Sequence, residues 1–156
     1  MSMEHKKNKE PGIILDLGCG ANKYPGAIGV DNVFLNTVDI IYDLLFVPYP
    51  FSTGCVDQVI LSHVLEHFSY TEIDLILTEV YRVLSSQGNV IVSVPHAFSV
   101  AFHSDPTHKT SFTFETMYYF TPDHHFSYYK SLNSIWKIEK LWASVNLLNN
   151  KFVQFK

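Results

Sequence analysis

Near the start of the chain, a short apolar run ends in a pair of glycines. Residues 13–17 read Ile-Ile-Leu-Asp-Leu, and Gly18-Cys19-Gly20 follow directly. A run of this kind, bounded by turn residues, is typical of a parallel strand that is buried on both faces. Residues 27–31 and 38–43 repeat the pattern, and each run ends in an aspartate. The sequence therefore predicts three successive strands, with a glycine turn after the first.

The link between the first two predicted strands is too short for a crossover helix. Parallel strands are usually joined by about a dozen or more residues, whereas residues 22–26 hold Pro25 among turn formers. We therefore expect the first helix to be reduced or absent. Its absence would leave apolar strand surface exposed near residues 13–17, and exposed apolar patches commonly mark interfaces. A homodimer is the assembly that this reasoning predicts.

The middle of the chain predicts a strand, a helix and a second strand. Residues 56–62 are rich in β-forming side chains. Ser69 and Glu72 then form a capping-box pattern, and apolar residues recur at helical spacing as far as Leu84. Gly88 is a candidate C-cap, and residues 89–94 form a β-branched strand before Pro95. This order predicts a right-handed unit of two parallel strands joined by a helix.

The remaining segments complete one α/β domain over residues 11–156, preceded by a flexible tail at residues 1–10. Residues 96–109 look like a loop and residues 113–120 like a short helix. Two β-forming stretches follow, at 135–145 and 152–155, with Asn149-Asn150 as a turn candidate. The expected fold is a mostly parallel sheet with antiparallel C-terminal strands.

Composition excludes several classes of protein. A hydrophobic fraction of 47% and an aromatic fraction of 15% predict an ordered core. Eleven Lys and Arg residues against fifteen Asp and Glu residues give a net charge of −4, so we expect no direct nucleic-acid partner. No apolar run approaches the ~20 residues of a membrane helix. The two cysteines, Cys19 and Cys55, form no CxxC pair, which favours a reducing compartment and a cytoplasmic protein.

Acidic residues at the ends of the predicted strands indicate a ligand site. The carboxyl ends of strands in an open α/β sheet form the crevice where ligands bind. Asp31 suits the two hydroxyls of a ribose because a carboxylate can accept both hydrogen bonds, and Asp43 is placed to help hold a base. The alternative is that these acids are strand-end caps beside an ordinary glycine turn.

Seven short segments within residues 13–95 carry a family resemblance. They are 15–20 (Leu-Asp-Leu-Gly-Cys-Gly), 29–31 (Gly-Val-Asp), 43–44 (Asp-Leu), 48–51 (Pro-Tyr-Pro-Phe), 56–57 (Val-Asp), 63–67 (His-Val-Leu-Glu-His) and 79–84 (Glu-Val-Tyr-Arg-Val-Leu). Together they resemble the class I S-adenosylmethionine-dependent methyltransferases. The resemblance implies a Rossmann-like class I methyltransferase fold with S-adenosylmethionine as the cofactor.

The resemblance also assigns roles to particular residues. It implies that Asp31 binds the ribose and that Asp43 and Leu44 border the adenine. The remaining residues that it places at the cofactor are Asp16, Gly18 and Gly20 at the methionine part, Ser62 and His63 at the methionine and methyl group, Cys19 within the glycine turn, and Asn32 directly after Asp31. Asn22 stands where the family commonly has a third glycine.

The segment after residue 95 is the expected acceptor side. It contains His96, His103, Asp105 and His108. A neutral histidine can take a proton from an acceptor hydroxyl, and we predict His108 as this base with Asp105 as its orienting partner. The alternatives are a metal site built from the same side chains and a purely structural loop. For His63 and His67, whose spacing suits a metal pair, we predict no metal.

Methyl transfer is therefore the predicted reaction. The expected acceptor is an oxygen or nitrogen nucleophile of a small-molecule or glycan-type substrate. One alternative is a non-catalytic domain that binds S-adenosylmethionine or a partner. The other is an NAD-dependent oxidoreductase, because Gly18 and Gly20 begin a GxGxxG pattern, although Lys23 occupies its third glycine position.

Overall fold

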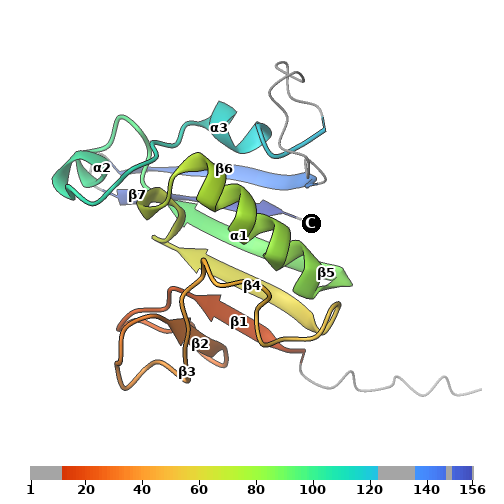
Figure 1. Cartoon of the computed structure of the whole chain (residues 1–156). Coiled ribbons are helices and arrows are strands. Elements are labelled where there is room, and N and C mark those ends of the chain that lie inside the picture. Colours follow the sequence, from red (N-terminus) through yellow and green to blue (C-terminus); the bar gives the residue numbers. More distant parts are fainter. Residues whose placement is uncertain (1–11, 123–135, 147–148, 156) are drawn as a thin grey trace, which may run out of the picture.

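One seven-stranded sheet organises the described part of the chain. The computed structural model describes residues 12–122, 136–146 and 149–155 (Figure 1). The strand order across the sheet is β3-β2-β1-β4-β5-β7-β6. The strands are β1 (Ile14–Leu17), β2 (Ile28–Asp31), β3 (Ile40–Ile41), β4 (Val56–Ser62), β5 (Leu84–Val94), β6 (Ile138–Asn146) and β7 (Asn149–Phe155). The helices are the 3₁₀ turn η1 (Leu65–His67), α1 (Tyr70–Val83), α2 (Val100–Ser104) and α3 (Phe114–Tyr118).

The sheet is parallel except at β7. Strand β1 pairs in parallel with both β2 and β4, and β7 runs antiparallel to β5 and to β6. This arrangement confirms the predicted mostly parallel α/β fold with antiparallel C-terminal strands. Because the strand order reverses between β1 and β4, the crevice for a ligand is expected at the carboxyl ends of these two strands.

The link between β1 and β2 contains no helix, as predicted. Two tight turns fill it, closed by hydrogen bonds from Asn22 N to Cys19 O and from Ala27 N to Tyr24 O. The expected exposed apolar surface at residues 13–17 is confined to Ile13, which is 41% exposed, because Leu15 and Leu17 are both completely buried. Further exposed apolar side chains nearby are Ile41 in β3 and, in the segments after β2 and β3, Val33, Phe34 and Phe46.

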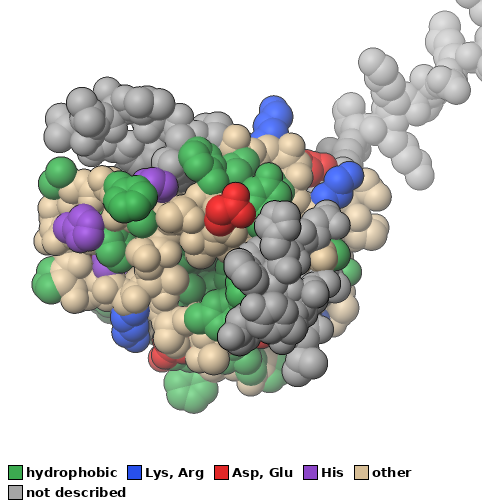
Figure 2. Space-filling model, turned by 90° about the horizontal axis from the view of Figure 1, so that it is seen from above, with side chains coloured by type: hydrophobic (Ala, Val, Ile, Leu, Met, Phe, Trp, Pro, Cys, Tyr) green, Lys and Arg blue, Asp and Glu red, His purple; other side chains and the backbone are tan. Residues whose placement is uncertain are grey.

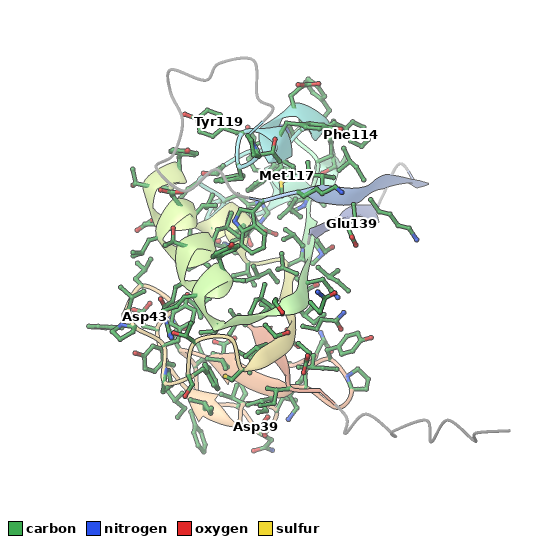
Figure 3. All side chains as sticks on the ribbon, turned by 90° about the vertical axis from the view of Figure 1, so that its right-hand side faces the viewer. Asp39, Asp43, Phe114, Met117, Tyr119 and Glu139 are labelled. Carbon is green, nitrogen blue, oxygen red and sulfur yellow. The ribbon has the colours of Figure 1, made fainter. Side chains whose placement is uncertain are left out.

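Helix α1 covers one face of the sheet (Figures 1 and 3). The predicted capping box is present, since Ser69 N donates to Glu72 Oε2 at 2.7 Å. The apolar stripe of the helix is buried, at Ile73, Ile76, Leu77, Val80 and Val83. The predicted C-cap role of Gly88 is wrong. Strand β5 starts at Leu84, the residue after the helix, so Gly88 lies inside that strand beside a register shift in its pairing with β4.

Two further predictions need correction. The segment 96–109 is not entirely loop, because α2 forms one helical turn with the Ser99 side chain accepting from Phe102 N at 3.2 Å. The turn proposed at Asn149-Asn150 is also wrong, since both residues lie in β7. The predicted helix at 113–120 is confirmed as α3, capped by Thr113. The predicted tail at 1–10 lies outside the described residues, and none of the described helices is long and apolar enough to span a membrane.

A charged network fixes the segment after β3 to α1. Glu79 is 7% exposed, and its Oε1 accepts from Tyr49 N at 2.6 Å. Arg82 Nε donates to Glu79 Oε2 at 2.9 Å, and Arg82 Nη1 donates to Phe51 O at 3.0 Å. These hydrogen bonds, above all those from Arg82, hold the pKa of Glu79 below its ordinary value. The network therefore positions a segment that begins with Asp43 and Leu44.

Arg82→Ala is expected to lower the free energy of unfolding by about 2 kcal/mol, less than the ~3–5 kcal/mol of a fully buried pair because Arg82 is partly exposed. Since the pKa of Glu79 is lowered in the folded state, its stabilisation is present above its unfolded value of 4.5 and is lost as the pH falls through the folded value. The deficit of the variant should therefore shrink in acid. Urea unfolding at neutral and acidic pH measures both effects. The control is Lys109→Ala, which removes an exposed pair with Glu72 and should change stability by less than about 0.5 kcal/mol.

Candidate functional site

A cavity of about 380 Å³ opens where the carboxyl ends of β1, β2 and β4 meet. Its size is within the roughly 300–1,000 Å³ range of small-molecule pockets. A second cavity of about 380 Å³, beside Arg82 and Trp136, contains none of the predicted site residues. The residues that line the first cavity are Gly18, Asp31, Asn32, Tyr42, Asp43, Leu44, Leu45, His63, Val64, His67 and Phe68.

Gly18 forms the floor of this cavity at the end of β1. Its backbone is in the left-handed region, with φ of +71°, and its N–H donates to Val30 O at 2.7 Å. A Cβ atom at this position would lie 2.5 Å from Val64 Cγ2, and Val64 also lines the cavity. Glycine is therefore required here both by the backbone conformation and by the close approach of the segment after β4.

Asp31 ends β2 and lies in the cavity wall with both carboxylate oxygens engaged. Its Oδ2 accepts from Gly20 N at 2.8 Å, and its Oδ1 accepts from Val33 N at 3.0 Å. Each carboxylate oxygen has two lone pairs, so acceptor capacity remains for a ligand. Neighbouring Asn32 is exposed and lines the same cavity.

Four of the predicted residues lie beside the cavity without lining it: Asp16, Cys19, Gly20 and Ser62. Asp16 is 3% exposed, and its Oδ2 accepts from Tyr24 N at 2.6 Å. Burial is the main cause that raises the pKa of Asp16 and also that of the Cys19 thiol. Gly20 donates to Asp31, whereas Ser62 is exposed at the end of β4. The structure thus gives Asp16 and Gly20 a role in shaping the turn.

The segment after β3 supplies the apolar side of the cavity. Asp43 Oδ1 accepts from Leu45 N at 2.9 Å, which closes a turn that presents Leu44 and Leu45. Figure 3 places Asp43 on the side of the sheet that α1 covers. Tyr42 also lines the cavity, and its hydroxyl donates to Pro48 O at 3.1 Å. Of the residues in this wall, the sequence predicts only Asp43 and Leu44.

The segment after β4 forms the wall opposite β2. His63 has φ of +59°, the one positive value among non-glycine residues of the described chain. Such a conformation costs roughly 1–3 kcal/mol and persists where the surroundings impose it, often at functional sites. Here His63 N donates to Ser93 O at 2.8 Å. The sequence predicts His63 but not Val64 or Phe68, because apolar residues are expected equally in a cavity wall and in the core.

The predicted base, His108, is not among the residues that line the cavity. Its side chain is 7% exposed, and its ring lies 4.8 Å from that of His67, centroid to centroid. His108 Nε2 is 3.8 Å from Asp105 Oδ2. Hydrogen bonds from Thr107 are the main cause that lowers the pKa of Asp105. The structure thus brings Asp105 and His108 together, with His67 as their neighbour in the cavity wall.

Comparison with known families gives a match over one part of the chain. Residues 42–92 match a family model described as a methyltransferase domain. No curated protein matches the sequence significantly.

Solved structures resemble the fold over most of the described chain. A SAM-dependent methyltransferase from Archaeoglobus fulgidus has a TM-score of 0.60 and 22% identity, over 68% of this chain and 57% of that chain. This chain therefore spans less than two thirds of that relative. A SAM-dependent methyltransferase from Methanosarcina mazei has a TM-score of 0.64 and 13% identity, over 94% of this chain and 91% of that one.

A third similar structure contains ligands. It is 1,6-didemethyltoxoflavin-N1-methyltransferase from Burkholderia thailandensis, with bound 1,6-didemethyltoxoflavin and S-adenosylhomocysteine. Its TM-score is 0.66 at 12% identity, and the match covers 93% of this chain and 70% of that one. At these identities the structural likeness concerns the fold.

Proposed function

We propose that this chain is a class I, S-adenosylmethionine-dependent methyltransferase that transfers a methyl group to an oxygen or nitrogen nucleophile of a small-molecule or glycan-type acceptor. The methyltransferase-domain match over residues 42–92 and the likeness of the fold to solved methyltransferases support this proposal. The observation that carries the proposal is the cavity at the carboxyl ends of β1, β2 and β4. The cavity combines the backbone of Gly18, the carboxylate of Asp31 and the apolar wall after β3. These three surfaces suit the methionine part, the ribose and the adenine of an adenosyl ligand.

In this proposal, each wall holds one part of the cofactor. Asp31 accepts hydrogen bonds from the ribose hydroxyls, while Asp43 and Leu44 border the adenine. The methionine part lies against Gly18 and His63, with Asn32 beside the ribose. The other predicted residues act by shaping or flanking the turns that hold it: Asp16, Cys19, Gly20 and Ser62. Bound S-adenosylmethionine supplies a methyl group already activated on a sulfonium. The task of the protein is then to align the acceptor, with reacting atoms about 3–3.5 Å apart.

The acceptor proton requires a base on the histidine side of the cavity. We retain His108 as the proposed base and Asp105 as its orienting partner, since a lowered pKa keeps Asp105 negatively charged beside the imidazole. His67 contacts His108 and also lines the cavity, so it connects the proposed base to the space in which the substrate would bind.

A non-catalytic role or a dimer is favoured by a different observation. Phe34 and Phe46 are 81% and 70% exposed, and each closely follows residues that line the cavity. Exposed aromatic side chains beside a site that lacks its first helix suit contact with a second copy of the chain or with a partner. Light scattering with Phe34→Ser as the variant tests this. A monomer at high concentration, with unchanged cofactor affinity in the variant, argues against it.

Isothermal titration with intact cofactors tests the main proposal. We expect one site for S-adenosylmethionine or S-adenosylhomocysteine, with affinity for NADH at least tenfold weaker, because Lys23 stands where a dinucleotide turn needs its third glycine. Mass spectrometry of ligand that co-purifies with the protein gives a second reading and must identify the whole ligand. Tight NADH binding without S-adenosylmethionine binding would overturn the proposal.

A further inference from the structure

We propose that Glu66, His67 and His108 form a binding site for a divalent transition-metal ion, such as Zn²⁺, in the wall of the cavity. One side-chain ligand atom from each of the three lies within 4.8 Å of the others. They come from η1 and from the segment after α2. The backbone joins these elements, because Lys109 N and Thr110 N both donate to Glu66 O, at 2.7 and 3.1 Å.

The buried carboxylate of Glu66 is the feature that points to a bound cation. Its side chain is completely buried, and neither carboxylate oxygen has a hydrogen-bond partner. The nitrogen His63 Nδ1 lies 3.2 Å from Oε1 but without hydrogen-bond geometry. Buried carboxylates are normally paired or coordinate metals, because an isolated buried charge is very costly. A cation between Glu66 and the two histidines would satisfy it.

Hydrogen bonds fix both histidines in the form that binds metal. Thr107 Oγ1 donates to Asp105 Oδ1 at 2.6 Å, so it accepts the hydrogen from His67 Nδ1, 2.9 Å away. His108 Nδ1 lies 2.8 Å from Phe102 O, and a carbonyl can only accept. In both rings Nδ1 therefore carries the hydrogen, so the nitrogen left to bind a metal is Nε2, which holds the lone pair in the neutral imidazole. Metal-binding histidines typically donate their other N–H in this way.

The donor set selects the type of ion. Two imidazole nitrogens and one carboxylate suit Zn²⁺ and other first-row transition metals, whereas Mg²⁺ and Ca²⁺ prefer oxygen ligands. Three protein ligands are also the number found in catalytic zinc sites, which keep one position open. His67 lines the cavity, so an open position there would be reached from the substrate side.

This placement narrows the acceptor to a hydroxyl, an extension that rests on the proposed methyl transfer. A divalent ion lowers the pKa of a bound hydroxyl, which then releases its proton to water. The oxygen lone pair forms the new bond to the methyl carbon as the carbon–sulfur bond breaks and its electron pair stays on sulfur. The ion is unchanged. With the ion bound, His108 is its ligand and no longer acts as the base proposed above for the metal-free site.

Zinc titration of chelator-treated protein tests the site directly. Calorimetry should find one Zn²⁺ per chain, and Co²⁺ should give the visible absorption of a nitrogen–oxygen site. Loss of a ligand in His67→Ala or Glu66→Gln should weaken Zn²⁺ binding by about 100-fold or more. Thr107→Val, which removes only the partner of His67 Nδ1, should weaken it by roughly 10–100-fold. The matched control is His103→Ala, on exposed α2 outside the cluster, which should bind as the wild type does.

The outcomes separate the competing roles. Absence of Zn²⁺ binding by the wild type, or unchanged binding in both ligand variants, would overturn the metal site. Because Glu66 is buried, thermal unfolding accompanies each titration, and partly exposed His67 provides the variant that should keep its fold. Lost turnover in His108→Ala, with no ion bound to the wild type, would instead support the base. Zinc binding without S-adenosylmethionine binding would refute the proposed function and leave the metal site standing.

Discussion

Gly18→Ala is expected to lower the affinity for S-adenosylmethionine by about 30-fold or more. The added methyl group would lie 2.5 Å from Val64 Cγ2, at a backbone φ of +71°. Left-handed backbone costs an alanine roughly 1–2 kcal/mol, and overpacking adds roughly 1–3 kcal/mol. Relief of the contact must move either the glycine turn or Val64, and both line the cavity. The affinity measured by calorimetry and the midpoint of thermal unfolding should therefore both fall in this variant.

Gly26→Ala is the matched control for this variant. Gly26 has φ of +80°, but a Cβ atom there meets nothing within 4 Å, and the residue does not line the cavity. It should lose only the backbone contribution, about 1 kcal/mol of stability, and keep its cofactor affinity. If Gly18→Ala binds S-adenosylmethionine as tightly as Gly26→Ala does, Gly18 does not form the floor of the cofactor site.

The parts of the fold that the sequence predicts are those with local signals. The capping box of Ser69 and Glu72 fixes the start of α1, and the turn that contains Gly18 and Gly20 fixes the end of β1. Gly88 failed as a C-cap because tertiary pairing extends β5 back to Leu84, opposite Val56 of β4. A glycine pattern alone cannot reveal that a neighbouring strand pairs this far.

The candidate site divides in the same way. Asp31 and Asp43 are predictable because parallel strands that end in acidic residues bring those residues to one edge. Glu66 and His108 are not, since their meeting depends on contacts across some forty residues, such as the one between His67 and Thr107. The sequence Glu66-His67 does not reveal that the Glu66 carboxylate lacks a hydrogen-bond partner in the fold. Only the folded chain shows that the segment after α2 brings histidine to it.

Asp31→Ala is expected to lower the affinity for S-adenosylmethionine by about 100-fold or more. Each hydrogen bond from a ribose hydroxyl to this carboxylate contributes about 1.5–3 kcal/mol. The carboxylate also holds Gly20 N and Val33 N, so a comparable loss could come from the turn alone. Asp39→Ala controls for this, because Asp39 likewise holds backbone, at Gly29 N, together with Lys23, but lies outside the cavity. That control should keep its affinity.

A double cycle with the ligand separates ribose recognition from turn geometry in Asp31→Ala. The two ligands are adenosine and 2′,3′-dideoxyadenosine, which differ only in the hydroxyls assigned to Asp31. Wild-type protein should prefer adenosine by at least about tenfold, since one such hydrogen bond exceeds 1.4 kcal/mol. The preference should vanish in Asp31→Ala, because the two changes remove the same interaction. If both proteins prefer adenosine by the same factor, the ribose does not bind at Asp31, even if the variant binds S-adenosylmethionine poorly.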